Sequence, residues 1–99
     1  GVWGFGAGEQ IAVKLRFYDG TGEHLRETPL SRDQQVEAVP EQAGVLNVSA
    51  TVADTPQFKW WLLGFGDGVE VLAPEMLRRS LSETVGKMAA RYAPTAPND

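Results

Sequence analysis

The sequence predicts an α+β fold in which helices cover one face of a single sheet. Three observations indicate it. Two segments, 11–18 and 45–53, alternate apolar and polar residues with the period of a strand. Two later segments, 54–63 and 74–92, start around a proline and carry apolar residues at helical spacing. The 99 residues of the chain are enough for one small domain with one core.

The first predicted strand covers residues 11–18. One set of its side chains is expected to face the core and the alternate set to face solvent. The first set is Ile11, Val13, Leu15 and Phe17, and the second is Ala12, Lys14, Arg16 and Tyr18. Turn residues at 19–22 end the strand. A short helix is predicted over 22–28, followed by an irregular connector at 29–34.

The next two strands are predicted over residues 34–39 and 45–53, joined by a turn of hairpin length at 40–44. The strand at 45–53 has the clearer pattern. Its apolar side consists of Leu46, Val48, Ala50 and Val52. Its polar side consists of Asn47, Ser49 and Thr51.

A helix is predicted over 54–63, because Asp54 or Thr55 can cap it and Pro56 suits its first turn. Its buried stripe is expected to contain Phe58, Trp61, Leu62 and Phe65. Gly64 and Gly66 are expected to end it with a left-handed cap. A short strand follows at 68–72, and the last helix is predicted over 74–92. The apolar face of that helix is Leu77, Leu81, Val85, Met88 and Tyr92.

In sequence order these elements match a ferredoxin-like βαββαβ two-layer sandwich with an extra C-terminal helix. In that arrangement the strands at 11–18 and 45–53 are neighbours, and the helices cover one face of the sheet. The other face is expected to be open and polar. It would carry Lys14, Arg16, Tyr18, Asn47, Ser49 and Thr51.

Composition excludes several kinds of site. The chain has no cysteine and one histidine, which excludes disulfides, thiolate chemistry and the usual zinc sites, so no cofactor or metal is expected. The net charge of −4 argues against holding nucleic acid by bulk electrostatics, although it is compatible with a local basic patch. No apolar run approaches the ~20 residues of a membrane span, so no membrane partner is expected. The lack of cysteine fits a cytoplasmic protein.

No group of side chains in the sequence indicates an enzyme. His24 lies beside Glu23 in the least regular segment, and neither Ser31 nor Ser80 has an evident base partner. The glycines of 64–68 follow a helix and precede a strand, which is the reverse of the order in a phosphate-binding loop. A non-catalytic domain is therefore expected.

The open face is the strongest candidate for binding. Two cations, one aromatic ring and three hydrogen-bonding groups on neighbouring strands suit a phosphate and a stacked base. A solvated face, or one that docks another domain, is the alternative. Trp60 lies about 100° round its helix from Trp61 and is a candidate interface residue, since tryptophan is enriched in interfaces. Packing at the rim of the core is the alternative for Trp60.

The sequence also resembles a known family. The run 54–66, then 69–77, then a helix closing on Arg91 and Tyr92, is similar to the C-terminal extension (WCX) of WYL-domain bacterial transcriptional regulators. Residues 15–17 and the connector 29–34 match in position. In the family the connector usually reads Pro-Leu-His, one variable residue, then Ser-Gln. Here Ser31 and Asp33 replace the His and the Ser, and Gln34 is kept, so the resemblance adds Gln34 to the ligand-binding candidates.

With the resemblance, the chain divides into three predicted parts: a connector at 1–10 from a missing upstream domain, a WCX-like domain at 11–92 and a tail at 93–99. The tail is expected to be disordered because it is rich in proline and polar residues. A winged helix-turn-helix and a WYL domain would precede them. In the family the extension helps form a homodimer and senses a ligand, which in some members is single-stranded DNA or another nucleic-acid species.

The sequence thus predicts a non-catalytic ligand-sensing and dimerisation domain of a bacterial regulator, with single-stranded nucleic acid or a nucleotide as the candidate ligand. Two alternatives stay open. One is a purely structural interaction domain, in which the open face and Trp60 pack on a neighbour. The other is a small-molecule-binding regulatory module.

Overall fold

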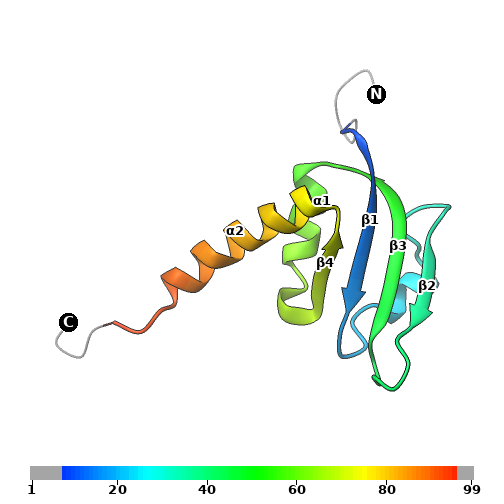
Figure 1. Ribbon diagram of the computed structural model, residues 1–99, viewed down its shortest axis with the longest axis horizontal. Helices are drawn as coiled ribbons and strands as arrows, with labels where there is room; N and C mark the ends of the chain where they lie inside the picture. Colours follow the sequence, from blue (N-terminus) through cyan, green and yellow to red (C-terminus); the bar gives the residue numbers. More distant parts are fainter. Residues whose placement is uncertain (1–7, 96–99) are drawn as a thin grey trace.

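The structure is a computed structural model that describes residues 8–95. One sheet, in the order β2-β3-β1-β4 with every neighbouring pair antiparallel, forms the centre of the domain. Its strands are β1 (Gln10–Phe17), β2 (Gln35–Ala38), β3 (Leu46–Ala53) and β4 (Val69–Ala73). The helical elements are α1 (Pro56–Leu63), α2 (Glu75–Arg91) and two short 3-10 turns, η1 (Glu23–Arg26) and η2 (Gly66–Gly68). This is the ferredoxin-like arrangement with a C-terminal helix, so the predicted fold class is confirmed (Figure 1).

Most of the predicted connector at 1–10, and part of the predicted tail at 93–99, lie outside the described residues. The element bounds agree with the sequence prediction to within one or two residues in the strands. β1 and β3 are neighbours over their full length, as predicted, with Gln10 opposite Ala53 and Phe17 opposite Leu46.

The core lies on the side of the sheet that the helices cover. Alternate residues of the strands supply most of it, because successive strand side chains point to opposite faces. The buried residues are Val13, Leu15, Phe17, Leu25, Leu46, Val48, Ala50, Leu62, Val71 and Leu77. Phe17 lies among aromatic rings, with edge contacts to Phe65 at 5.2 Å and to Trp61 at 6.3 Å between centroids.

The first helix of the predicted fold is reduced to the four-residue turn η1. A Cβ added to Gly22, at the start of this turn, would lie 2.7 Å from Cβ of Phe17, so the backbone passes directly over the core. Buried Leu25 anchors the turn. The predicted helix over 22–28 is therefore too long, since Pro29 follows closely and the packed Gly22 restricts its start.

The N-terminus of α1 is formed as predicted. Thr55 caps it, with its hydroxyl accepting a hydrogen bond from the Phe58 amide at 3.1 Å, and Pro56 occupies the first turn. At the other end the prediction is half right. Gly66 is left-handed, with φ of +59°, whereas Gly64 keeps right-handed helical angles with φ of −64°. Gly64 extends the helical turn because its amide donates to the Trp60 carbonyl.

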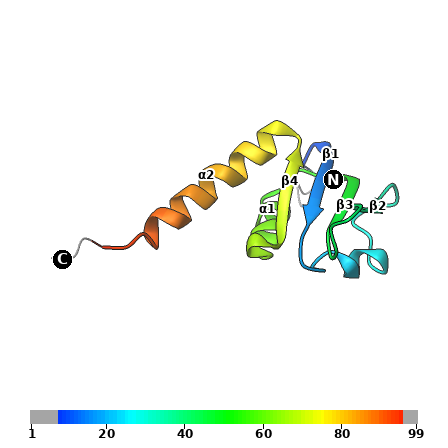
Figure 2. The same ribbon diagram turned by 60° about the horizontal axis from the view of Figure 1, so that its bottom comes forward.

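Helix α2 starts at the β4 edge and then leaves the sheet (Figures 1 and 2). Leu77 in its first turn is buried, and Leu81 packs against the core. Val85, Met88 and Tyr92, further along the same predicted apolar face, are exposed. Only the first half of that face therefore contributes to the core of this chain.

Candidate functional site

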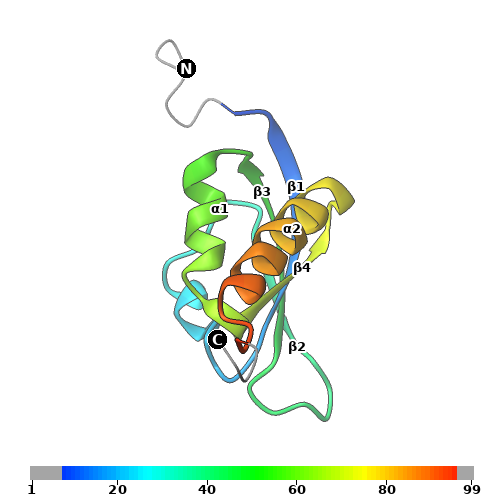
Figure 3. The same ribbon diagram turned by 90° about the vertical axis from the view of Figure 1, so that its left-hand side faces the viewer.

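One face of the sheet has no helix of the described chain on it. Figure 3 shows α1 and η1 together on the opposite side of the sheet. A hollow of about 360 Å³ on the uncovered side is lined only by strand residues: Lys14, Leu15, Gln35, Glu37, Asn47, Val48, Ser49 and Leu72. The Lys14 side chain is exposed. We call this side the open face, and it contains the predicted candidates of β1 and β3.

The strand register brings the predicted residues together in rows. Lys14 lies opposite Ser49, and Ser49 lies opposite Gln35. In the next row Arg16 lies between Asn47 on β3 and Glu70 on β4. Thr51 lies one row further along β3, opposite Ala12. Five of the predicted ligand-binding residues, Lys14, Arg16, Asn47, Ser49 and Thr51, therefore share the open face.

Two carboxylates on this face were missing from the predicted site. Glu37 lies opposite Asn47 on β2, and Glu70 lies opposite Arg16 on β4. Their position follows from the alternation of β2 and β4 once the buried residue of each strand is known. Val36 and Val71 point to the core, and the period of two then puts their neighbours on the open face. The two cations of β1 are therefore flanked by a carboxylate on each outer strand.

Arg16 is held in place by its neighbour on β3. Its Nε donates a hydrogen bond of 2.9 Å to Oδ1 of Asn47. A guanidinium fixed in this way loses less side-chain entropy when it binds an anion than a freely rotating one does. Lys14 has no hydrogen bond or ion pair with another side chain in the described part of the chain.

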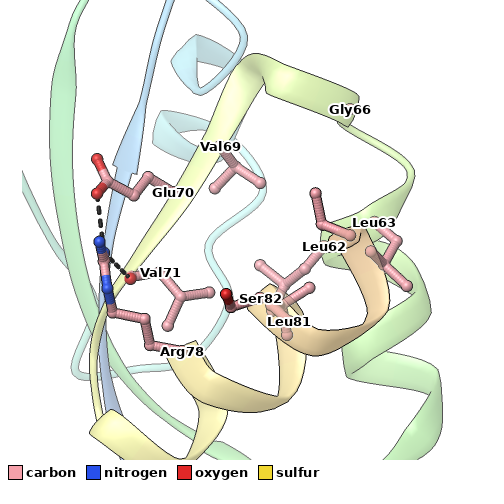
Figure 4. A pocket seen from close by; sticks show the side chains of 10 residues that line it. Leu62, Leu63, Gly66, Val69, Glu70, Val71, Arg78, Leu81 and Ser82 are labelled. Carbon is pink, nitrogen blue, oxygen red and sulfur yellow. Dashed lines mark hydrogen bonds and ion pairs between the residues drawn. The ribbon is translucent and has the colours of Figure 1, made fainter. Parts of the chain in front are cut away.

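Tyr18 lies just beyond the end of β1 and is tied to Glu70. Its hydroxyl donates to Oε1 of Glu70 at 2.6 Å. The other carboxylate oxygen accepts a bond of 2.8 Å from Nη1 of Arg78 on α2, and the same nitrogen also donates to the Val71 carbonyl (Figure 4). The bond from Tyr18, and then the bond from Arg78, lower the pKa of Glu70. The bond to Glu70 raises the pKa of Tyr18.

Thr51 is hydrogen-bonded to the connector that precedes β2. Asp33 accepts hydrogen bonds from the Thr51 amide at 2.9 Å and from the Thr51 hydroxyl. The Ser31 hydroxyl donates to the same carboxylate. The bond from Ser31, followed by those from Thr51, lowers the pKa of Asp33 to about 2. Ser31 and Asp33, the two residues that depart from the connector pattern of the family that the chain resembles, thus hold the connector against β3 by hydrogen bonds.

The side chain of Gln34 also forms hydrogen bonds that hold the connector in place. Its Oε1 accepts from the Leu30 amide and its Nε2 donates to the Leu25 carbonyl, both at 2.8 Å. Gln34 does not line the hollow on the open face. Its predicted ligand role stays a prediction, but both ends of its amide are engaged in holding the connector against η1.

Trp60 lies away from the open face, on α1. Its side chain is 67% exposed, so it does not pack into the core. With Met76 of α2 it lines a second hollow, which also contains the hydrogen bond that Lys59 Nζ donates to Ser80 Oγ. Its role as an interface residue stays a prediction.

Across residues 8–95, no cluster of His, Asp and Glu side chains is placed to hold a metal ion. Of the helices in the described range, none has both the length and the apolar character needed to cross a bilayer. In comparisons with known proteins, the family model of the WCX domain matches residues 9–89 of the chain. No curated protein matches it.

Proposed function

Because the chain belongs to the WCX domain family, we propose that it is a non-catalytic regulatory domain of a cytoplasmic WYL-type bacterial transcriptional regulator. In this proposal a winged helix-turn-helix and a WYL domain are its upstream partners in the same polypeptide. The domain senses a polar ligand and takes part in forming the homodimer of the regulator.

The observation that supports ligand sensing is the uncovered sheet face with its row of basic and amide groups. Lys14 and Arg16 are two residues apart on β1, so both project to the same side. Ser49 and Asn47 lie directly beside them. Charged donors next to neutral hydrogen-bonding groups suit a phosphate linked to a polar base or sugar.

The carboxylates on the outer strands limit the size of the ligand. A long polyanion that crossed the whole sheet from β2 to β4 would pass Glu37 and Glu70 as well as the two cations. A nucleotide, or a short single strand lying along β1 and β3, meets Lys14 and Arg16 and avoids most of that repulsion. We therefore favour a ligand of nucleotide size.

A chain of hydrogen bonds from the open face to α2 supports a regulatory role. Glu70 accepts hydrogen bonds from both Tyr18 and Arg78, so the sheet and the first turns of α2 share one carboxylate. A ligand that draws Arg16 or Tyr18 into new bonds changes the partners available to Glu70. Such a ligand biases the position of α2 to the extent that it binds the two arrangements with different affinity.

The test is a titration of the chain with mononucleotides and with short single-stranded DNA at low salt. The variant carries Lys14→Ala and Arg16→Ala, and the matched control carries Lys87→Ala and Arg91→Ala on the exposed side of α2. Both lose two positive charges. We expect the first pair to weaken binding by about tenfold or more, since each charged hydrogen bond contributes ~1.5–3 kcal/mol, and the second pair to change it little. Equal affinity of the two double variants, or no binding by the wild type, contradicts the phosphate role.

A structural docking role is the second candidate, and one observation favours it. Arg16, Tyr18 and Thr51 each have a side-chain partner within the chain, so much of the open face is satisfied without a ligand. On this candidate, sedimentation shows a stable dimer that Trp60→Ala abolishes. A thermal-shift screen with amino acids and nucleotides covers the third possibility, a small-molecule module, which predicts a raised melting temperature with one of them.

A further inference from the structure

Residues of α1 and of the first turns of α2 line a hollow on the helical side of the domain. Figure 3 shows the two helices next to each other on that side. The hollow has a volume of about 560 Å³, and Trp60 and Met76 form part of its wall. Their side chains are 67% and 54% exposed, although both are large and apolar. Single apolar residues scattered over a surface need no partner, but large ones that gather at one hollow mark a contact site.

The side chains around the hollow favour an aromatic occupant. The indole of Trp60 offers a stacked or edge-to-face contact, and the sulfur of Met76 offers a contact with the edge of a ring. Nζ of Lys59 donates a hydrogen bond of 2.8 Å to Oγ of Ser80, which holds a cation in the hollow for the face of a ring. An aliphatic side chain gains none of these three interactions. A cavity of about 150 Å³ accommodates benzene, so about 560 Å³ has room for more than one ring.

The described part of the chain begins beside this hollow. A Cβ added to Gly8 would lie 2.0 Å from the carbonyl oxygen of Asp54 and 3.2 Å from Cγ2 of Thr55, so the backbone at residue 8 is packed directly on these two residues. The amide of Asp54 also donates a hydrogen bond of 2.8 Å to the carbonyl of Glu9. Because Asp54 and Thr55 line the hollow, the segment that precedes Gly8 starts at the edge of the hollow.

The segment 1–7 contains the kind of side chain that the hollow favours. Trp3 and Phe5 are its aromatic residues, and glycines occupy positions 4 and 6. In an extended backbone, residues two apart project to the same side. The two rings of an extended segment therefore share one side, and the glycines add no side chain to the other.

Both rings can reach the hollow. Phe5 is three residues and Trp3 five residues before Gly8, which corresponds to at most ~11 and ~18 Å of extended chain. Trp60 is five residues after Thr55, the N-cap of α1, which is about 8 Å along the helix. A segment tethered this close to a site has an effective concentration in the millimolar range, so a weak contact is enough to fill the hollow.

We propose that the hollow between α1 and α2 binds residues 2–6 of the same chain. The ring of Trp3 packs against Trp60 and Met76, and the ring of Phe5 lies closer to Thr55. The hollow is thus an intramolecular docking site for an aromatic segment. This placement covers both exposed apolar side chains of the hollow with groups from the chain itself, so it needs neither a ligand nor a second copy.

Docking of the segment fixes the direction in which the chain enters the domain. In the regulator proposed above, the upstream domains are joined through this segment, so the docked rings orient the connector on the helical side. Trp60 then belongs to the contact between the domain and its own connector, and it takes no part in binding at the open face, whose hollow has a different lining. The orientation of upstream domains rests on the proposed function, whereas the docking itself does not.

The two methionines of the chain are matched reporters for a test by NMR. Met76 lines the hollow and Met88 lies further along α2, and the two are similarly exposed at 54% and 46%. In the full chain with labelled methionine methyl groups, we expect nuclear Overhauser contacts from the Met76 methyl to the ring of Trp3, and none from Met88. Trp3→Ala should shift the Met76 methyl resonance, whereas Val2→Ala, the control, should leave it in place. A Met76 resonance that is the same in wild type and Trp3→Ala overturns the proposal.

The same contacts can be assigned to one molecule or to two. A sample is mixed from chains that carry only the methyl label and chains that keep only the aromatic protons of tryptophan. Contacts that disappear on mixing lie within one molecule and support the proposal. Contacts that persist between the two kinds of chain place the segment on a second copy, and they overturn intramolecular docking.

A double-mutant cycle on stability gives a second test. Trp3→Ala and Trp60→Ala should each raise the equilibrium constant of unfolding, and the double variant should raise it by about two- to tenfold less than the product of the two effects. The control cycle combines Trp3→Ala with Val85→Ala, which is 50% exposed and lies outside the hollow, and its effects should simply multiply. Since Trp60 and Val85 are both exposed, these variants keep the core intact. Effects that multiply in both cycles show that Trp3 and Trp60 are not in contact, and they contradict the docking.

Discussion

The hydroxyl of Tyr18 donates a hydrogen bond of 2.6 Å to Oε1 of Glu70, which is 52 residues later in the chain. Arg78 of α2 binds the second oxygen of the same carboxylate. Glu70 therefore joins the end of β1, the edge strand β4 and the start of α2. It is the point at which the open face and the projecting helix meet.

The first prediction concerns the ionisation of Tyr18. The bond to Glu70 raises the pKa of Tyr18 above its ordinary value of 10.0. Folding therefore gains stability from this bond below pH 10 and loses it as the pH rises through the pKa of the folded state. The chain has two tyrosines, so in a Tyr92→Phe background the tyrosinate absorbance reports Tyr18 alone. Adding Glu70→Gln should lower the midpoint of that titration, and an unchanged midpoint would show that the bond has no such effect.

The second prediction concerns acid stability. The hydroxyl of Ser31 and then the groups of Thr51 lower the pKa of Asp33 from 3.8 to about 2. The carboxylate thus stabilises the fold above about pH 4, and this contribution is lost as the pH falls toward 2. Asp33→Asn should be less stable than wild type at neutral pH, and its free energy of unfolding should fall less steeply between pH 4 and 2. Urea melts at several pH values measure this, and parallel curves for the two proteins would contradict it.

The third prediction separates the two faces of β1. Leu15 is fully buried, while its neighbour Lys14 is exposed on the open face. Leu15→Ala should destabilise the chain by about 2–5 kcal/mol, because it removes apolar contacts and leaves a cavity. Lys14→Ala should change stability by no more than about 0.5 kcal/mol. Denaturation midpoints that fall equally in both variants would argue against the observed sidedness of the strand.

The fourth prediction concerns the carboxylate on β2. Glu37 lines the hollow on the open face together with Lys14. Glu37→Gln should raise the affinity for a nucleotide or short oligonucleotide by about two- to fivefold, the size expected for one exposed charge. Added salt should reduce this gain. Glu83→Gln on α2 removes the same charge at a distance and is the control. An equal gain in both variants would place the anion elsewhere or attribute the effect to net charge alone.

Much of the fold follows from local pattern. The alternation is strict over 13–17 and 46–52, so it locates the two central strands and the side of each that faces the core. A cap at Thr55 and a proline at Pro56 locate the start of α1. These features depend on neighbours in sequence, and such features can be recognised in a single chain.

Which side chains lie on the open face, by contrast, depends on how segments distant in the sequence pair with one another. Glu37 and Glu70 come from short strands whose apolar residues are few, so their faces become clear only once β2 and β4 are paired with the centre of the sheet. The engagement of Asp33 with Thr51 and of Gln34 with Leu25 arises from the path of the connector. Nothing in the local pattern of 29–34 specifies that path.

The exposure of α2 has a similar origin. Its apolar spacing is uniform from Leu77 to Tyr92, and helical spacing alone does not predict where the neighbouring sheet ends. The edge of β4 decides that Leu77 is buried and that Val85 is half exposed. The sequence identifies the stripe, and only the tertiary arrangement shows that half of it lacks a partner in the described chain.

The most direct test of ligand sensing at the open face is a map of amide chemical shifts during titration with a mononucleotide and with a short single-stranded oligonucleotide. We expect the shifts to concentrate at Lys14, Arg16, Asn47 and Ser49, with smaller changes reaching Glu70 and Arg78. Shifts confined to the helical side around Trp60 and Val85, or none with either ligand, would contradict the assignment of the open face as the binding surface.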